Sequence, residues 1–518
     1  MPGDLTEKPF NMRKNTFILL CFIAAKFVLQ YILINPVYDL QRDEYLHLDQ
    51  ANHLAWGYIS VPPLTSWIAY IIKLLGNGFF WVKFFPALFG ALTILLVWKT
   101  IETLNGGLFA LVAGSLAILV SVILRINILF QPNSTDIFFW TLVYFTIVKY
   151  ISTFNSKWLF ATALAIGFGI LSKYNMVFLL LGLLPAILLT KHRKLFLDKN
   201  FYLSIGITAI IVLPNLIWQY QNHFPTFHQL NDLARTQLVN VKRANFIKDQ
   251  FLYFSDSVVI ILAAFAAFFF YQPFKQYRLF FWSYVITLCI FVFLKAKSYY
   301  AIGLYPILIC FGIVYLEYRL AQGWKKYVRI AIIILIIGGS IPFLLIAFPV
   351  KSPMAIQKNN KQYKAFGLLR WEDGKDHSLP QDFADMIGWK ELALKVDGIY
   401  STLPNKDKTL VLCDNYGQAG AINYYTTQNI KAVSFNADYI NWFDLSNKFE
   451  NLIRVKERNE AHEELAVTSP FFQNSMIAGS ITNNCAREFG TTIFAFTAAK
   501  IDIRERIKNE ISEKKNHR

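Results

Sequence analysis

The segment YDLQRDEYLHLDQ, residues 38–50, concentrates charge between two apolar stretches of the chain. Arg42, Asp43, Glu44 and Asp49 all lie within it. Charged side chains are costly inside a bilayer, so such a cluster marks either the edge of a membrane span or a site. An acid pair at that edge has three interpretations: a general base for a hydroxyl group, a metal ligand, or a solvated surface pair.

The composition around this segment is that of a polytopic membrane protein. Of its 518 residues, 55% are hydrophobic and only 16% are charged, against about 25% charged residues in soluble proteins. The net charge of +17 is explained by the Lys and Arg that collect in cytoplasmic loops. Because the basic residues stand in short runs between apolar segments, we expect the lipid bilayer as a partner and no nucleic acid.

A spanning helix needs about 20 mostly apolar residues. The shorter apolar stretch 64–76 is predicted to lie at the membrane interface, within a first outer loop at 36–78. Residues 1–350 are therefore predicted to form an α-helical polytopic domain. Its spans number about eleven, near residues 15–35, 79–98, 107–124, 135–150, 158–172, 175–190, 201–218, 251–271, 279–295, 299–316 and 330–349.

The charge asymmetry of the loops predicts the orientation. With the N-terminus in the cytoplasm, the inner loops are basic, as in KHRKLFLDK at 191–199. An odd number of spans then places residues 351–518 outside. There TLVLCD and KAVSF are typical of strands, and NYGQAGAINYY between them of a loop leading into a helix. We predict a soluble α/β domain, in which Cys413 and Cys485 have the opportunity to pair in an oxidising compartment.

This orientation places further polar residues on the outer face. Asp136, in QPNSTD, is predicted to lie at the outer end of a span. Cations at the outer boundary can hold a phosphate, although each one singly also fits a lysine or arginine that reaches from the bilayer to the interface. Those predicted on this face include Arg125, Lys173, Lys242, Arg243 and Lys297.

A metal site is not favoured. His47 and His53 stand near Asp43 and Asp49 at helical spacing, but two histidines with no third evident ligand are a weak signal. The chain has no phosphate-binding GxxxxGK[ST] loop, so transport driven by ATP is not expected.

The run RDEYLHLDQANHLAWGYISVPPLTSWIAYIIKLLG, residues 42–76, resembles the first-loop signature of the family 39 glycosyltransferases. These are integral membrane enzymes of the GT-C type, related to protein O-mannosyltransferases and to the aminoarabinose transferase of lipid A. QPNSTDIFFW, GILSKYNMVFLL, LPNLIWQYQN and KSYYAIGLYP follow in the family's order. One departure is Ser60-Val61, where family members often carry an acid and a His or Lys; this argues against a close copy of the aminoarabinose enzyme.

The resemblance implies an inverting transfer of a sugar from a polyprenyl-phosphate donor, without a metal or other cofactor. It implies a bacterial inner-membrane protein whose acceptor, a glycolipid, a polysaccharide or a protein, is reached from the periplasm. Asp43 is the expected catalytic carboxylate, supported by Glu44 and Asp136. The residues expected to contact the substrates are Arg42, Tyr45, Tyr58, Arg125, Lys173, Lys242, Arg243, Lys297 and Tyr300.

Two other classes of protein remain open from the sequence. A transporter or lipid flippase is suggested by the number of spans and by Lys26 within the first of them, although charges near the bilayer midplane and internal repeats are expected of that class. A non-catalytic envelope assembly protein, with the outer domain as its binding module, is the third hypothesis.

Overall fold

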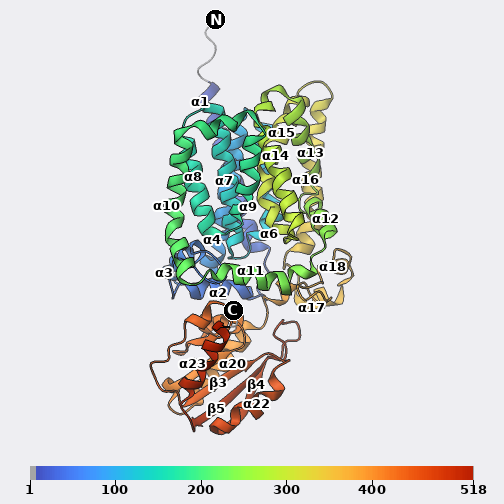
Figure 1. Cartoon of the computed structure of the whole chain (residues 1–518). Helices are drawn as coiled ribbons and strands as arrows, with labels where there is room; N and C mark the ends of the chain where they lie inside the picture. The colour runs from blue at the N-terminus through green and yellow to red at the C-terminus, as the bar shows by residue number, and fades with distance from the viewer. Residues whose placement is uncertain (1–6, 517–518) are drawn as a thin grey trace.

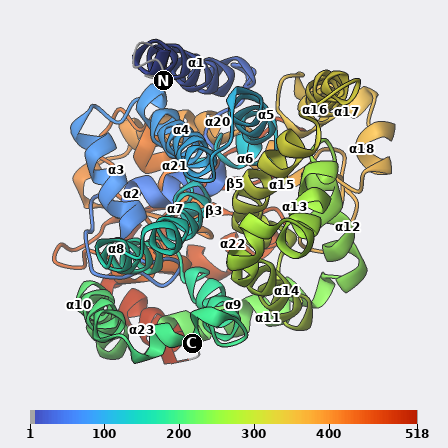
Figure 2. The same cartoon turned by 90° about the horizontal axis from the view of Figure 1, so that it is seen from above.

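The computed structural model describes residues 7–516, which form a bundle of long helices and a smaller domain built on a β-sheet (Figure 1). Seen along the bundle, the helices stand side by side and the sheet domain lies beneath them (Figure 2). The bundle is made of α1 (Glu7–Ile32), α4 (Phe79–Thr103), α5 (Leu108–Leu119), α6 (Val122–Ile126), α7 (Pro132–Thr153), α8 (Lys157–Ser172), α9 (Met176–Leu188), α10 (Lys199–Gln221), α12 (Arg243–Tyr253), α13 (Val258–Phe270), α14 (Arg278–Phe293), α15 (Tyr305–Arg319) and α16 (Lys325–Ala347).

The predicted class, a helical membrane domain followed by an α/β domain, is confirmed. Each predicted span contains a helix. Within the described residues, six helices are long and apolar enough to cross a membrane, or eight if two sharply bent pairs each form one span. One of these pairs is α12 with α13, which meet at 97°. The figure of about eleven spans therefore stays a prediction.

The first outer loop folds against the sheet domain. It forms α2 (Arg42–Gln50) and α3 (Leu64–Leu74), at the end of the bundle that faces that domain (Figure 1). Helix α3 is the short apolar helix predicted at 64–76. Helix α2 begins with a capping box. The side chain of Gln41 accepts a hydrogen bond from the backbone N–H of Glu44, and the carboxylate of Glu44 accepts one from the backbone N–H of Gln41.

Between the bundle and the sheet, the chain makes α17 (Pro353–Lys358), α18 (Lys361–Ala365), α19 (Gln381–Ala384) and α20 (Trp389–Thr402). The sheet has the order β2-β1-β3-β5-β4. Strand β1 is parallel to β2 and β3, whereas β5 is antiparallel to β3 and β4. The remaining elements are β1 (Thr409–Cys413), α21 (Tyr416–Tyr425), β2 (Ala432–Ser434), β3 (Asn451–Lys456), α22 (Ala461–Thr468), β4 (Phe472–Ser480), β5 (Thr492–Ala499) and α23 (Ile503–Asn516).

These elements agree with the sequence in the sheet domain. TLVLCD and KAVSF contain β1 and β2, and NYGQAGAINYY contains α21. Cys413 and Cys485 are both free thiols.

One hydrophobic core is shared by the two domains, because α2 packs on α21. Tyr45 of α2 is fully buried, and its ring makes edge contacts with Trp389 and Tyr424. The helices approach closely at Gly420, where an added Cβ would lie 2.8 Å from the Cβ of Tyr45. The two domains therefore pack against each other through a tight helix–helix contact.

We predict that Gly420→Val destabilises the protein by about 1–3 kcal/mol, because the valine has to displace α2 from α21. Gly398→Val is the matched control, since Gly398 also lies in a helix but has open space around its Cβ position. Thermal unfolding of both variants in detergent measures the difference; equal melting temperatures would contradict the close packing.

Candidate active site

Asp43, the second residue of α2, lies where the two domains meet. Its Oδ1 accepts a hydrogen bond from the phenol of Tyr416 at 2.7 Å. Its Oδ2 accepts one from the side-chain amide of Gln131 at 3.0 Å. Tyr416 is the first residue of α21 in the sheet domain, and Gln131 precedes α7 in the bundle. The carboxylate is thus held from both sides by side chains of different domains.

Arg42 fixes the tyrosine that contacts Asp43. Its guanidinium stacks on the ring of Tyr416, 4.3 Å from the ring centroid, and its backbone N–H donates to the carbonyl of Asp385 at 3.0 Å. Burial raises the pKa of the Asp385 carboxyl to about 7, against the lowering effect of Arg487 and Arg42. The predicted residue Arg42 therefore lies at the site, as a neighbour of the Asp43 carboxylate.

The side chain of Glu44 lies in the interior of the protein, away from the domain junction. It is fully buried, and both its oxygens lie 2.7 Å from the ammonium of Lys83 in α4. The same oxygens accept from the backbone N–H groups of Phe130 at 2.6 Å and of Gln41 at 2.7 Å. With these four contacts the carboxylate is already occupied, so the geometry assigns Glu44 to holding α2 in place.

The predicted cations Lys173 and Lys297 lie near Asp43 with Tyr300. Lys173 donates to the Asn133 side chain at 2.7 Å and lies 4.4 Å from the ring centroid of Tyr300. Burial acts to lower the pKa of Lys297, but Glu372 above all, with Tyr300 and Asp43, raises it. The ammonium of Lys297 also donates to the Glu372 carboxylate at 2.5 Å, so its charge is paired within the protein.

Asp136 lies behind this region. It is buried at 5% exposure, and its Oδ2 accepts from the Asn175 amide at 2.8 Å. The same amide donates to the backbone carbonyl of Tyr300 at 3.1 Å. Asp136 therefore acts on the site through the segment that carries Tyr300.

Three other residues predicted to contact the substrates use their side-chain polar groups in hydrogen bonds within the protein. Arg125 donates to the Asp382 carboxylate at 2.8 Å. The phenol of Tyr45 lies 3.3 Å from that of Tyr425. The phenol of Tyr58 donates to the backbone carbonyls of the first outer loop.

The last two predicted cations lie at the start of α12, where Lys242 ends the long loop after α10 and Arg243 is the first helical residue. Arg243 donates to the carbonyl oxygens of Val292 and Phe293 at 3.0 and 3.2 Å, so it caps the end of α14. Lys242 is exposed on the same loop. The amphipathic helix α11 (Pro225–Thr236) precedes them and lies across the end of the bundle that faces the sheet domain (Figure 1).

The histidines of the first loop have local partners. His47 lies 3.2 Å from the Gln50 side chain, and His53 stacks on Trp442. Asp49 accepts from the phenol of Tyr439 at 2.7 Å. Within residues 7–516, no three His, Cys, Asp or Glu side chains are grouped to hold a metal ion. The expectation that no metal or other cofactor is used stays a prediction.

Sequence reasoning missed four residues that shape this site: Lys83, Gln131, Glu372 and Tyr416. Lys83 carried a usable signal, because a lysine inside an apolar span needs a buried partner. Glu372 and Tyr416 lie more than 300 residues from Asp43, so only the docking of the domains brings them close.

The comparisons with known proteins agree with this architecture. The family described as Dolichyl-phosphate-mannose-protein mannosyltransferase matches residues 60–218. The lipid A galacturonosyltransferase RgtD of Rhizobium johnstonii is 23% identical over 198 residues, 36% of this chain and 41% of that relative. The chain thus matches about two fifths of the curated relative's length.

Among solved structures, ArnT from Cupriavidus metallidurans bound to undecaprenyl phosphate matches with a TM-score of 0.60 at 14% identity, over 93% of this chain and 98% of ArnT. The Archaeoglobus fulgidus oligosaccharyltransferase matches with a TM-score of 0.51 at 13% identity, over 85% and 68%. The protein therefore has the fold of the GT-C glycosyltransferases. The predicted resemblance to these enzymes is confirmed, and the mannosyltransferase model matches residues 60–218 of the membrane domain.

We predict that Glu44→Gln destabilises the protein by about 3–5 kcal/mol, because it leaves the buried Lys83 ammonium without its countercharge. The double variant Glu44→Gln/Lys83→Met should recover much of this loss. Glu505→Gln, which breaks the exposed pair with Lys508, is the control and should cost at most about 1 kcal/mol. Thermal unfolding measures all three; a loss for Glu44→Gln no larger than the control's would show that the pair is not needed.

Proposed function

We propose that this protein is a membrane glycosyltransferase that moves a sugar from a polyprenyl-phosphate donor to an acceptor at the outer face of the membrane, with inversion. The observation that carries the proposal is the Asp43 carboxylate. It lies at the junction of the membrane and sheet domains, bonded to Gln131 and Tyr416.

Asp43 acts as the general base. Each of its oxygens accepts one hydrogen bond from the protein and retains a lone pair for a further donor. An acceptor hydroxyl gives its proton to this carboxylate as its oxygen attacks the anomeric carbon of the donor sugar. The bond between that carbon and the phosphate oxygen breaks on the opposite face, so the configuration inverts.

The cations act on the leaving group. The departing polyprenyl phosphate carries developing negative charge at the membrane surface, where its lipid chain keeps it. Lys173, held over the ring of Tyr300, and Lys297, which is paired with Glu372, are the cations assigned to this role. Fixed positive charges of this kind stabilise a transition state in which such charge builds up. Tyr300 lies beneath the Lys173 ammonium and holds it in place.

The relatives support the substrate classes. ArnT was crystallised with undecaprenyl phosphate, which supports a polyprenyl-phosphate donor. The curated relative is named for lipid A, which favours a glycolipid over a polysaccharide or a protein as the acceptor. We place the protein in the bacterial inner membrane, with residues 351–518 in the periplasm and no metal in the reaction.

Asp43→Asn should lower the rate of sugar transfer by about 10²- to 10⁴-fold, the usual contribution of a general base. Purified full-length protein is supplied with a polyprenyl-phosphate sugar and an envelope glycolipid extract, and transfer is followed by mass spectrometry. Asp407→Asn, an exposed aspartate of the sheet domain, is the control. Transfer at the wild-type rate by Asp43→Asn would overturn the assigned role.

The same purified protein distinguishes a glycosyltransferase from a transporter or lipid flippase. Reconstituted in proteoliposomes, the protein should release polyprenyl phosphate only when sugar is transferred. Movement of the lipid-linked sugar across the bilayer without transfer would instead support the flippase hypothesis.

A further inference from the structure

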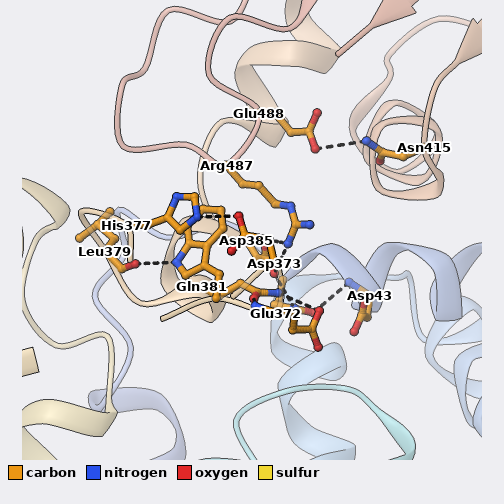
Figure 3. Close-up of polar contacts among 12 residues, drawn as sticks. Asp43, Glu372, Asp373, His377, Leu379, Gln381, Asp385, Asn415, Arg487 and Glu488 are labelled. Atoms are coloured by element: carbon orange, nitrogen blue, oxygen red, sulfur yellow. Dashed lines mark hydrogen bonds and ion pairs between the residues drawn. The ribbon is translucent and has the colours of Figure 1, made fainter. Parts of the chain in front are cut away.

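A cavity of about 410 Å³ opens at one edge of the sheet domain. This volume lies within the range of small-molecule sites, about 300–1,000 Å³. Three loops line it: 371–379 between α18 and α19, 457–459 after β3, and 484–491 before β5. Figure 3 shows residues of these loops, among them His377, Arg487 and Glu488, in one view with Asp43.

The topology of the sheet explains why the loops converge. Strands β1 and β3 are parallel, so their carboxyl ends share an edge of the sheet. Strand β5 is antiparallel to β3, so it begins at that same edge. Ligands of sheets with parallel strands bind outside the carboxyl ends of those strands. The cavity occupies this position.

The wall of the cavity is rigid where it faces the bundle. Trp371 stacks on His377 with 3.7 Å between ring centroids, and its indole N–H donates to the carbonyl of Leu379 at 2.8 Å. The guanidinium of Arg487 lies over the same indole and donates to the buried Asp385 carboxylate at 3.0 Å. These side chains are fixed before any ligand arrives.

The mouth of the cavity offers exposed polar groups, and one of them, the Asn484 oxygen, is engaged by the thiol of Cys485 at 3.6 Å. Arg458, Asn459 and Asn484 are exposed there. Arg458 lies over the ring of Phe489, and within the described residues no hydrogen bond or ion pair engages its guanidinium. Glu457 and Glu488 balance the charges of Arg458 and Arg487 in the lining. Glu488 is buried and already accepts hydrogen bonds from Asn415, Gln418 and Thr491. A neutral ligand rich in hydroxyl groups, which donate and accept, fits this lining.

The cavity is linked to Asp43 by two chains of contacts. Glu488 accepts from Asn415 at 3.2 Å, and the next residue, Tyr416, donates to Asp43. Arg487 pairs with Asp385, whose backbone carbonyl accepts from Arg42, the residue before Asp43. The wall of the cavity is therefore coupled, through Tyr416 and Arg42, to the residues that hold Asp43.

We propose that this cavity is a binding subsite for the saccharide part of the acceptor. It rests on the proposed function in that the acceptor bound there is the one whose hydroxyl Asp43 activates. The subsite recognises sugar hydroxyls through Arg458, Asn459 and Asn484 at the edge of the sheet, away from the membrane surface where the donor is held.

Direct binding tests the subsite without any transfer. The full-length protein in detergent is mixed with chitobiose, a neutral disaccharide of N-acetylglucosamine, and saturation-transfer NMR gives its dissociation constant. Arg458→Ala and Asn484→Ala should each weaken binding by about 5- to 30-fold, the effect of 1–2 kcal/mol. Arg506→Ala, which removes another arginine stacked on a phenylalanine, Phe471, is the matched control and should bind like the wild type.

The melting temperature of each variant checks its fold. Absence of chitobiose binding to the wild type would overturn the proposal, and so would folded Arg458→Ala and Asn484→Ala variants that bind like the wild type. The catalytic proposal fails separately: Asp43→Asn that transfers sugar normally would overturn the base while leaving chitobiose binding intact.

Discussion

The buried ion pair between Glu44 and Lys83 is the interaction on which the site depends. It joins α2 to α4 inside the protein, while the same carboxylate closes the capping box of α2 and accepts from the backbone of Phe130. Removing one partner of such a pair is costly because the other charge is left buried. One glutamate thus fixes the start of α2, and with it the position of the adjacent Asp43.

The second constraint is the docking of the sheet domain on α2. Tyr45 faces the sheet domain, and Gly420 allows α21 to approach it. This contact brings Tyr416 to Asp43 and the carboxyl edge of the sheet to the end of the bundle. The sheet domain therefore contributes to the proposed site directly, through the side chain of Tyr416, which is bonded to Asp43.

The predicted site residues separate into distinct roles. Asp43, Lys173, Lys297 and Tyr300 gather near the junction, and Arg42 orients the tyrosine that bonds to Asp43. Glu44 and Asp136 support them from behind through buried hydrogen bonds. The remaining candidates, such as Tyr45 and Arg243, contact other parts of the protein. The acids Asp43, Glu44 and Asp136 thus have different surroundings, because their burial and their hydrogen-bond partners differ.

The sequence by itself determined the helical membrane class and the α/β domain that follows it, because hydropathy and local motifs are properties of adjacent residues. It also predicted Asp43. It assigned Glu44 a supporting role without its partner Lys83, and it missed Tyr416 and Glu372. Only the tertiary structure decided these, because the partners of a side chain are set by the packing of helices and strands that lie hundreds of residues apart in the chain.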